Sequence, residues 1–172
     1  MQAVATGDES ALRELCARWE RPLYGFLHRA GGGADVDDLY QETWLRVVRA
    51  ARRFDPARRF STWLFQIALN LCRDLHRKAL PQPAEPALLE EVAASPPQDR
   101  SVEAALDARR LLDALPEAQR EVVVLRVLQD ASEAEAAEIL GCPRGTVKSR
   151  LHHALARLAV LARGEGGEAV RS

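Results

Sequence analysis

Apolar residues recur with the period of an α-helix in the N-terminal half of the chain. Between residues 35 and 52 they follow the spacing i, i+3, i+4, i+7, i+8, one stripe of an amphipathic helix, and Asp35 stands where an N-cap is expected. A second stripe of this kind occupies 61–78. A third helix is predicted over roughly 9–29, bent or broken at Pro22, because proline removes a backbone donor and crowds the preceding turn.

The C-terminal half contains one stretch that two kinds of secondary structure could explain. The run Val122-Val123-Val124-Leu125 is rich in β-branched residues, which favour strands. The apolar run extends to Leu128, however, and Pro116 suits the first position of a helix. We therefore predict a helix here.

Further along, two short helices joined by a tight turn are predicted. Ser132 and Glu135 are the two halves of a capping box, which opens a short helix that ends before Gly141. Gly141 can take a positive φ, and Pro143 prevents the helix from continuing. A second helix follows over about 146–161. This arrangement is typical of a helix-turn-helix.

Proline marks the boundary between the two halves. Five of the nine prolines lie in residues 81–100, and proline-rich sequence favours an extended linker. We therefore expect an N-terminal domain over 1–80, a flexible linker over 81–100 and a C-terminal domain over 101–172. The expected fold class is all-α, with two small helical domains of which the second is a helix-turn-helix.

The net charge of −1 conceals two basic islands. Residues 42–80 carry a balance of +6 and residues 142–172 a balance of +4, whereas the other segments are acidic. Two basic surfaces fit two contacts with a polyanion such as nucleic acid, although solvated helix faces also gather charge by chance. The first residues lack the features of a signal peptide, and no apolar run is long enough to span a membrane, so we expect a cytoplasmic protein.

The last predicted helix separates into two faces. Its apolar face consists of Val147, Leu151, Leu155, Leu158 and Ala162. The opposite face carries short or planar polar groups flanked by cations, which suits base edges in the major groove with phosphates on either side. The candidate DNA-binding residues here are Arg144, Thr146, Lys148, Ser149, Arg150, His152 and His153.

The helix predicted over 35–52 has Leu45 at the centre of its polar face. A lone apolar side chain ringed by polar groups fits a protein–protein contact, and it equally fits an isolated exposed leucine. The polar face consists of Asp38, Gln41, Glu42, Leu45, Arg49 and Arg52.

The loop after this helix interleaves basic and aromatic residues, and the next helix continues with a polar and basic stripe. Stacking faces together with cations suit unpaired bases. The aromatic residues, Trp63 above all, could equally belong to the core beneath a solvated basic face. The candidate DNA-binding residues of this half are Phe54, Arg58, Arg59, Phe60, Ser61, Trp63, Gln66, Asn70, Arg73, Arg77 and Lys78.

Neither the cysteines nor the histidines indicate a metal or catalytic site. The three cysteines are far apart and form neither a disulfide framework nor a zinc motif, and small buried side chains explain them. The adjacent His152 and His153 point about 100° apart on a helix, with no Cys, Asp or Glu one turn away. We find no nucleophile–base pair and no phosphate loop, and we expect no cofactor and no enzymatic activity.

Three motifs in this order resemble the sigma factors of bacterial RNA polymerase. Residues 38–46 resemble sigma region 2.2, which binds core polymerase. Residues 54–70 resemble regions 2.3 and 2.4, which melt and read the −10 promoter element. Residues 115–152 resemble region 4, which reads the −35 element. The order and the linker are those of the extracytoplasmic-function group of the sigma-70 family, and the resemblance covers about residues 8–162.

The resemblance implies a function for each candidate surface. Asp38, Gln41, Glu42 and Leu45, with Arg49 beside them, would contact the clamp helices of the polymerase β′ subunit. The 54–63 loop would capture a flipped base of the non-template strand, and an anti-sigma factor would regulate the protein. The family usually has arginine where His153 and Leu155 stand, which predicts a weaker −35 contact.

Two other functions compete with this interpretation. A helix-turn-helix transcriptional regulator with an N-terminal sensor or dimerisation domain would share the C-terminal half. A sensor, however, would need neither the polar face over 38–46 nor the basic and aromatic loop. The third possibility is an enzyme, for which we find no supporting motif.

Overall fold

The described residues form a helical protein. A computed structural model describes residues 1–31, 34–79 and 108–163, and no strand occurs within these ranges. The linker expected over 81–100 lies outside the described residues. The elements are α1 (Gln2–Ala5), α2 (Glu9–Ala30), α3 (Val36–Ala50), the 3-10 turn η1 (Ala51–Arg53), α4 (Phe60–Ala79), α6 (Glu117–Val123), the π-helical segment η2 (Val124–Leu128), α7 (Glu133–Leu140) and α8 (Arg144–Ala162). Residues 108–113 are also helical. The all-α prediction is confirmed.

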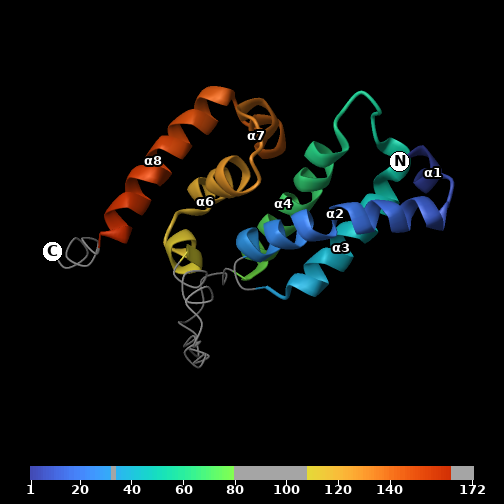
Figure 1. Cartoon of the computed structure of the whole chain (residues 1–172), viewed down its shortest axis with the longest axis horizontal. Coiled ribbons are helices and arrows are strands. Elements are labelled where there is room, and N and C mark those ends of the chain that lie inside the picture. The colour runs from blue at the N-terminus through green and yellow to red at the C-terminus, as the bar shows by residue number, and fades with distance from the viewer. Residues whose placement is uncertain (32–33, 80–107, 164–172) are drawn as a thin grey trace.

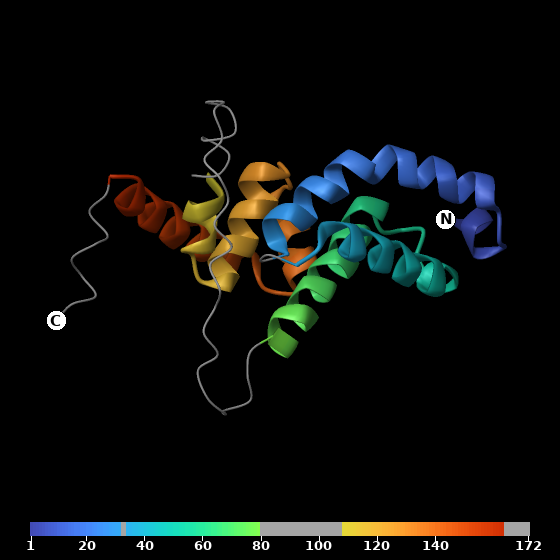
Figure 2. The same cartoon turned by 90° about the horizontal axis from the view of Figure 1, so that it is seen from below.

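Local capping explains where the N-terminal helices begin. The Asp35 carboxylate accepts hydrogen bonds from the backbone N–H groups of Asp37 and Asp38 and starts α3, as its position in the sequence predicts. Of the two outcomes expected at Pro22, a bend or a break, the break does not occur: α2 runs through this residue as one helix, which arches over its neighbours in Figure 2. Leu23 and Phe26, just beyond the proline, are fully buried. Their burial offsets the backbone hydrogen bond that proline removes.

In the C-terminal half, helix is confirmed over strand for residues 122–125. Pro116 is the N-cap of α6 rather than its first residue, and α6 continues into η2. The capping box of Ser132 and Glu135 is complete in both directions and opens α7. Gly141 ends α7 with φ 66°, and α8 begins at Arg144, two residues before its predicted start. The turn between the two helices is therefore tighter than expected.

The two halves of the chain pack against each other. One hydrophobic cluster contains Leu23 and Leu64 from the N-terminal half together with Leu125 and Ile139 from the C-terminal half. Helix α4 contacts α2 and α3 on one side and α7 on the other, and both views show the two groups of helices side by side (Figures 1 and 2). A smaller cluster contains Leu112, Leu115, Val123 and Ala154. No helix among the described residues has the length and apolar content needed to cross a membrane.

Candidate protein-docking and nucleic-acid surfaces

Helix α3 buries one face and presents the other to solvent. Leu39, Trp44 and Val47 are buried, and the buried Thr43 hydroxyl donates to the Leu39 carbonyl at 2.7 Å. On the opposite face Leu45 is 50% exposed. Its predicted companions Asp38, Gln41 and Arg49 are exposed and Glu42 is half-buried. The structure thus brings together the polar face that the sequence predicts, on a helix that a buried face holds in place.

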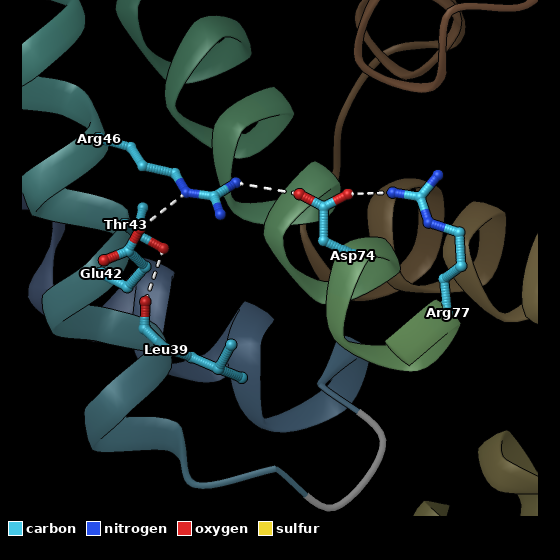
Figure 3. Close-up of polar contacts among 6 residues, drawn as sticks. All are labelled: Leu39, Glu42, Thr43, Arg46, Asp74 and Arg77. Atoms are coloured by element: carbon cyan, nitrogen blue, oxygen red, sulfur yellow. Dashed lines mark hydrogen bonds and ion pairs between the residues drawn. The ribbon is translucent and has the colours of Figure 1, made fainter. Parts of the chain in front are cut away.

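Arg46 joins this face to α4, as Figure 3 shows. Its Nε donates to Glu42 Oε1 at 3.0 Å, and its Nη1 donates to Asp74 Oδ2 at 3.3 Å. The other Asp74 oxygen accepts from Arg77. The hydrogen bond to Glu42, partly offset by burial, raises the pKa of Arg46. These contacts connect Glu42 on the predicted docking face to Arg77 on the predicted DNA stripe.

Sequence reasoning missed Arg46 and Asp74. The i, i+4 spacing of Glu42 and Arg46 is a signal that could have found the first pair. No sequence signal places Asp74 beside Arg46, because the two residues lie on different helices.

The aromatic residues of the loop form a cluster of their own. The ring centroids of Phe54 and Trp63 lie 5.0 Å apart, and each ring lies 6.1 Å from that of Phe60. All three side chains are half-buried, as is Ser61. The structure therefore combines the two interpretations of Trp63, since the ring packs on its neighbours and still reaches solvent.

The predicted polar and basic stripe of α4 is exposed to solvent at only some of its positions. Asn70, Arg77 and Lys78 are exposed, whereas Gln66 and Arg73 are half-buried. The prediction that the whole stripe faces outward is corrected here, because the C-terminal half covers part of it. The reason is that α4 has a second packing face, which includes the buried Leu69 and Cys72.

Carboxylates of the C-terminal half pair with several cations of the N-terminal half. Arg73 donates from Nε and Nη2 to the two carboxylate oxygens of Glu121 at 2.6 and 2.7 Å. Arg58 donates to Glu138 at 2.7 Å and to Gln66 at 3.1 Å. The remaining contacts are Arg59 with Glu135 at 2.5 Å and His76 Nδ1 with Glu117 at 3.1 Å. No sequence signal predicts these pairs, because each joins segments far apart in the chain.

Helix α8 presents most of its candidate residues to solvent. Arg144, Lys148, Ser149, His152 and His153 are exposed, and Thr146 and Arg150 are half-buried. Ser149 Oγ donates to the Thr146 carbonyl at 3.1 Å, a bond within the helix.

The predicted inner face of α8 is wrong at two positions. Leu155 is 47% exposed and Ala162 is also exposed, whereas Ala154 is fully buried. Val147 is buried as predicted. The reason is that the seam follows positions 147, 151, 154 and 158, with small Ala154 packed among Leu112, Leu115 and Val123. The exposed Leu155 instead lines a mainly apolar hollow of about 680 Å³ with Val127, Leu128 and Leu158.

The cysteines divide by their surroundings. Cys72 is buried, and burial raises the pKa of its thiol to about 12. Cys16 and Cys142 are only half-buried, so the expectation of buried cysteines is correct for Cys72 alone. All three are free thiols. Within the described ranges, no three His, Cys, Asp or Glu side chains gather closely enough to hold a metal ion.

Two known families match the sequence of this chain, one in each half. Residues 15–80 match Sigma-70 region 2, and residues 105–158 match Sigma-70, region 4. The chain is 36% identical over 162 residues to the ECF RNA polymerase sigma factor SigM of Mycobacterium tuberculosis, which covers 94% of this chain and 82% of SigM. It is 32% identical over 166 residues to the ECF RNA polymerase sigma factor SigW of Bacillus subtilis, and this match covers 88% of this chain and 89% of SigW.

Two solved structures resemble the fold over nearly the full length of the chain. One is CnrH in complex with the cytosolic domain of CnrY, with a TM-score of 0.73 and 31% identity, covering 95% of this chain and 94% of CnrH. The other is the sigma factor RpoE of Bartonella quintana in complex with the anti-sigma factor NepR. This match has a TM-score of 0.74 and 28% identity, and it covers 88% of this chain and 96% of RpoE.

Proposed function

Because this chain belongs to the extracytoplasmic-function group of the sigma-70 family, we propose that it binds core RNA polymerase through α3 and reads promoter DNA through α4 and α8. It is a sigma factor that directs promoter-specific transcription initiation. This removes the alternative of a regulator with an N-terminal sensor domain, since region 2 occupies that half. The chain performs no covalent step, because the polymerase supplies the catalysis.

The exposed face of α3 is the proposed contact with the β′ clamp helices. Its central feature is Leu45, half-exposed among Asp38, Gln41, Glu42 and Arg49. An apolar anchor surrounded by polar groups has the composition of a binding hot spot. The buried inner face of α3 supports this proposal, because it presents the anchor on a fixed helix.

The proposed −10 surface combines the aromatic cluster with the cations of α4. Phe54, Phe60 and Trp63 offer half-buried rings on which an unpaired base can stack, and Arg77 and Lys78 are exposed beyond them. Stacking contributes about 1–3 kcal/mol per base, comparable to the few kcal/mol that unstacking a base costs. Binding energy for the melted strand thus favours the open duplex. The proposed −35 surface is the outward face of α8, from Arg144 to His153.

The regulation of this chain is also a proposal. CnrH was solved with the cytosolic domain of CnrY and RpoE with the anti-sigma factor NepR. We infer that a protein of the anti-sigma class binds this chain as well, in the cytoplasm where the polymerase works.

Run-off transcription with purified core polymerase on a genomic promoter library tests the proposed function. The wild-type chain should direct initiation at defined sites, and footprints should cover a −10 and a −35 element. Asn70→Ala/Arg77→Ala should reduce duplex opening, and Lys148→Ala/His152→Ala should reduce protection at −35. Arg13→Ala, on an exposed part of α2, is the matched control and should behave as wild type. A wild-type chain that adds no promoter-directed transcript to core polymerase would refute the proposal.

A further inference from the structure

We propose that Trp19 is a positioning residue for base capture at the −10 element, because it fixes the ring of Phe60 on which an unpaired base stacks. This rests on the proposed −10 surface and adds a residue from outside the loop that forms it. Trp19 is half-buried on α2. Its ring centroid lies 5.9 Å from that of Phe60, and the two ring planes meet at 61°.

The contact between Trp19 and Phe60 ties the proposed −10 surface to the hydrophobic core. Trp19 forms a second edge-to-face pair with Phe65, at a centroid distance of 6.1 Å, and Phe65 lies 5.1 Å from Phe26. Phe26 is fully buried and Phe65 is 7% exposed. A continuous row of rings therefore runs from the core through Trp19 to Phe60.

The loop before Phe60 does not itself fix this ring. The Arg58 N–H donates to the Asp55 carbonyl at 3.0 Å, and the Ala57 N–H donates to the Asp55 carboxylate at 2.9 Å, so both bonds are local. Phe60 is the first residue of α4, where the backbone N–H groups have no partner within the helix. The two arginines of the loop pair with α7, which leaves the orientation of the Phe60 ring to its aromatic neighbours.

Trp19 differs from the other rings around Phe60 in where it comes from. Phe54 and Trp63 each lie 6.1 Å from Phe60, and they belong to the proposed surface itself. Trp19 belongs to α2, which packs against α4. The described ring partners of Trp19 all lie in the N-terminal half, so this contact does not depend on the position of the C-terminal half.

Base capture is strongest when the stacking ring is already in place. A side chain that becomes ordered only on binding loses conformational entropy, which lowers the affinity. Edge-to-face aromatic pairs have a preferred geometry that an aliphatic side chain does not impose. Without the ring of Trp19, the Phe60 ring would occupy several rotamers, of which only some can stack on the base. The loss would fall on the captured base and not on the phosphate contacts.

The holoenzyme is tested with a fork-junction duplex whose non-template strand is unpaired at the −10 element of a promoter that run-off transcription identifies. Abasic sites are placed one at a time along the unpaired strand, and the position at which wild type loses most affinity marks the captured base. The ratio of the affinities for the intact and abasic probes then measures capture. Any misfolded fraction cancels in this ratio, because one preparation binds both probes.

The variants separate the ring of Trp19 from its bulk. Trp19→Leu keeps an apolar side chain and removes the ring, whereas Trp19→Phe keeps a ring. The matched control is Tyr24→Leu, which removes another half-buried ring from α2. Tyr24 stacks on Tyr40 at 4.5 Å and donates to Asp37, so this change disturbs the packing of α2 without touching the rings around Phe60. If circular dichroism shows that Trp19→Leu has lost helix, Trp19→Met replaces it, since methionine adapts to irregular gaps.

We expect an affinity ratio of about tenfold for wild type and for Tyr24→Leu, the scale of one base stacked on an aromatic side chain. Trp19→Leu should lower the ratio to about threefold, and Trp19→Phe should restore most of it. Trp19→Leu should keep the wild-type affinity for core polymerase. In a Phe60→Leu background, Trp19→Leu should lower the ratio no further, because Trp19 acts through Phe60.

An unchanged ratio in Trp19→Leu would overturn the inference. An equal loss in Tyr24→Leu, or a further loss in the Phe60→Leu background, would overturn it too. The wild-type holoenzyme separates these failures from a failure of the proposed function. If wild type distinguishes the base from an abasic site at some position, only the role of Trp19 is wrong. If it does so nowhere, the proposed −10 surface fails, and the role of Trp19 fails with it.

Discussion

At the scale of single residues, Leu45 carries the sharpest prediction. Leu45→Asp should weaken binding to core polymerase by about 2 kcal/mol or more, because a charged side chain would replace a half-exposed apolar anchor. The melting temperature should not change, since Leu45 lies outside the hydrophobic clusters that the described residues form. Fluorescence titration with core polymerase measures the effect. Val160→Asp, the same kind of change at an exposed residue of α8, is the control, and equal affinities would remove α3 as the contact.

Residue exposure could be predicted where helical periodicity alone decides it. Leu45 and His152 face outward as expected, because a regular helix leaves one face to solvent. Arg73 and Leu155 could not be placed in this way. The half-burial of Arg73 depends on its pairing with Glu121, a residue distant in sequence. The exposure of Leu155 depends on the close approach that small Ala154 permits.

At the scale of elements, helix α7 offers a test of pH dependence. Hydrogen bonds from Ser132, with a contribution from Arg59, lower the pKa of Glu135 below its ordinary value of 4.5. A depressed carboxylate pKa stabilises the fold above the unfolded-state pKa, and this stabilisation is lost as the pH falls through the folded-state pKa.

Glu135→Ala should therefore reduce the free energy of unfolding at pH 7 by about 1 kcal/mol, the usual scale of a helix cap. The difference from wild type should diminish as the pH falls below 4.5, the ordinary pKa of this carboxylate. Urea denaturation at several pH values measures it. Glu133→Ala, in the same first turn but outside the capping box, should show a smaller loss; equal losses would mean that the helix dipole alone acts here.

Helix boundaries could be predicted where local chemistry decides them, but not where tertiary packing does. Asp35, Ser132 and Gly141 start or end helices as predicted because each capping bond joins residues close in sequence. The helix is not broken at Pro22, one of the two outcomes predicted there, because tertiary burial of the residues beyond it outweighs the local cost of proline.

At the scale of the whole molecule, the sequence showed two halves of complementary charge but not how they meet. The basic island over 42–80 and the acidic segment over 101–141 are visible in the chain. Which arginine meets which glutamate depends on the relative placement of α4, α6 and α7. No periodicity or motif encodes that placement, so the sequence could not show that Arg73 is half-buried beside Glu121.

The salt dependence of promoter binding by the holoenzyme reports on the basic surface of the N-terminal half. Each cation that contacts a DNA phosphate releases counterions, which steepens the fall of affinity with salt. Arg77 and Lys78 are exposed at the end of α4. Arg77→Ala/Lys78→Ala should therefore make the log–log slope shallower by roughly two, about one for each lost phosphate contact. The control Arg13→Ala/Arg18→Ala removes two exposed cations from α2 and should keep the wild-type slope. An unchanged slope in the α4 variant would mean that this basic stripe is solvated surface without a DNA contact.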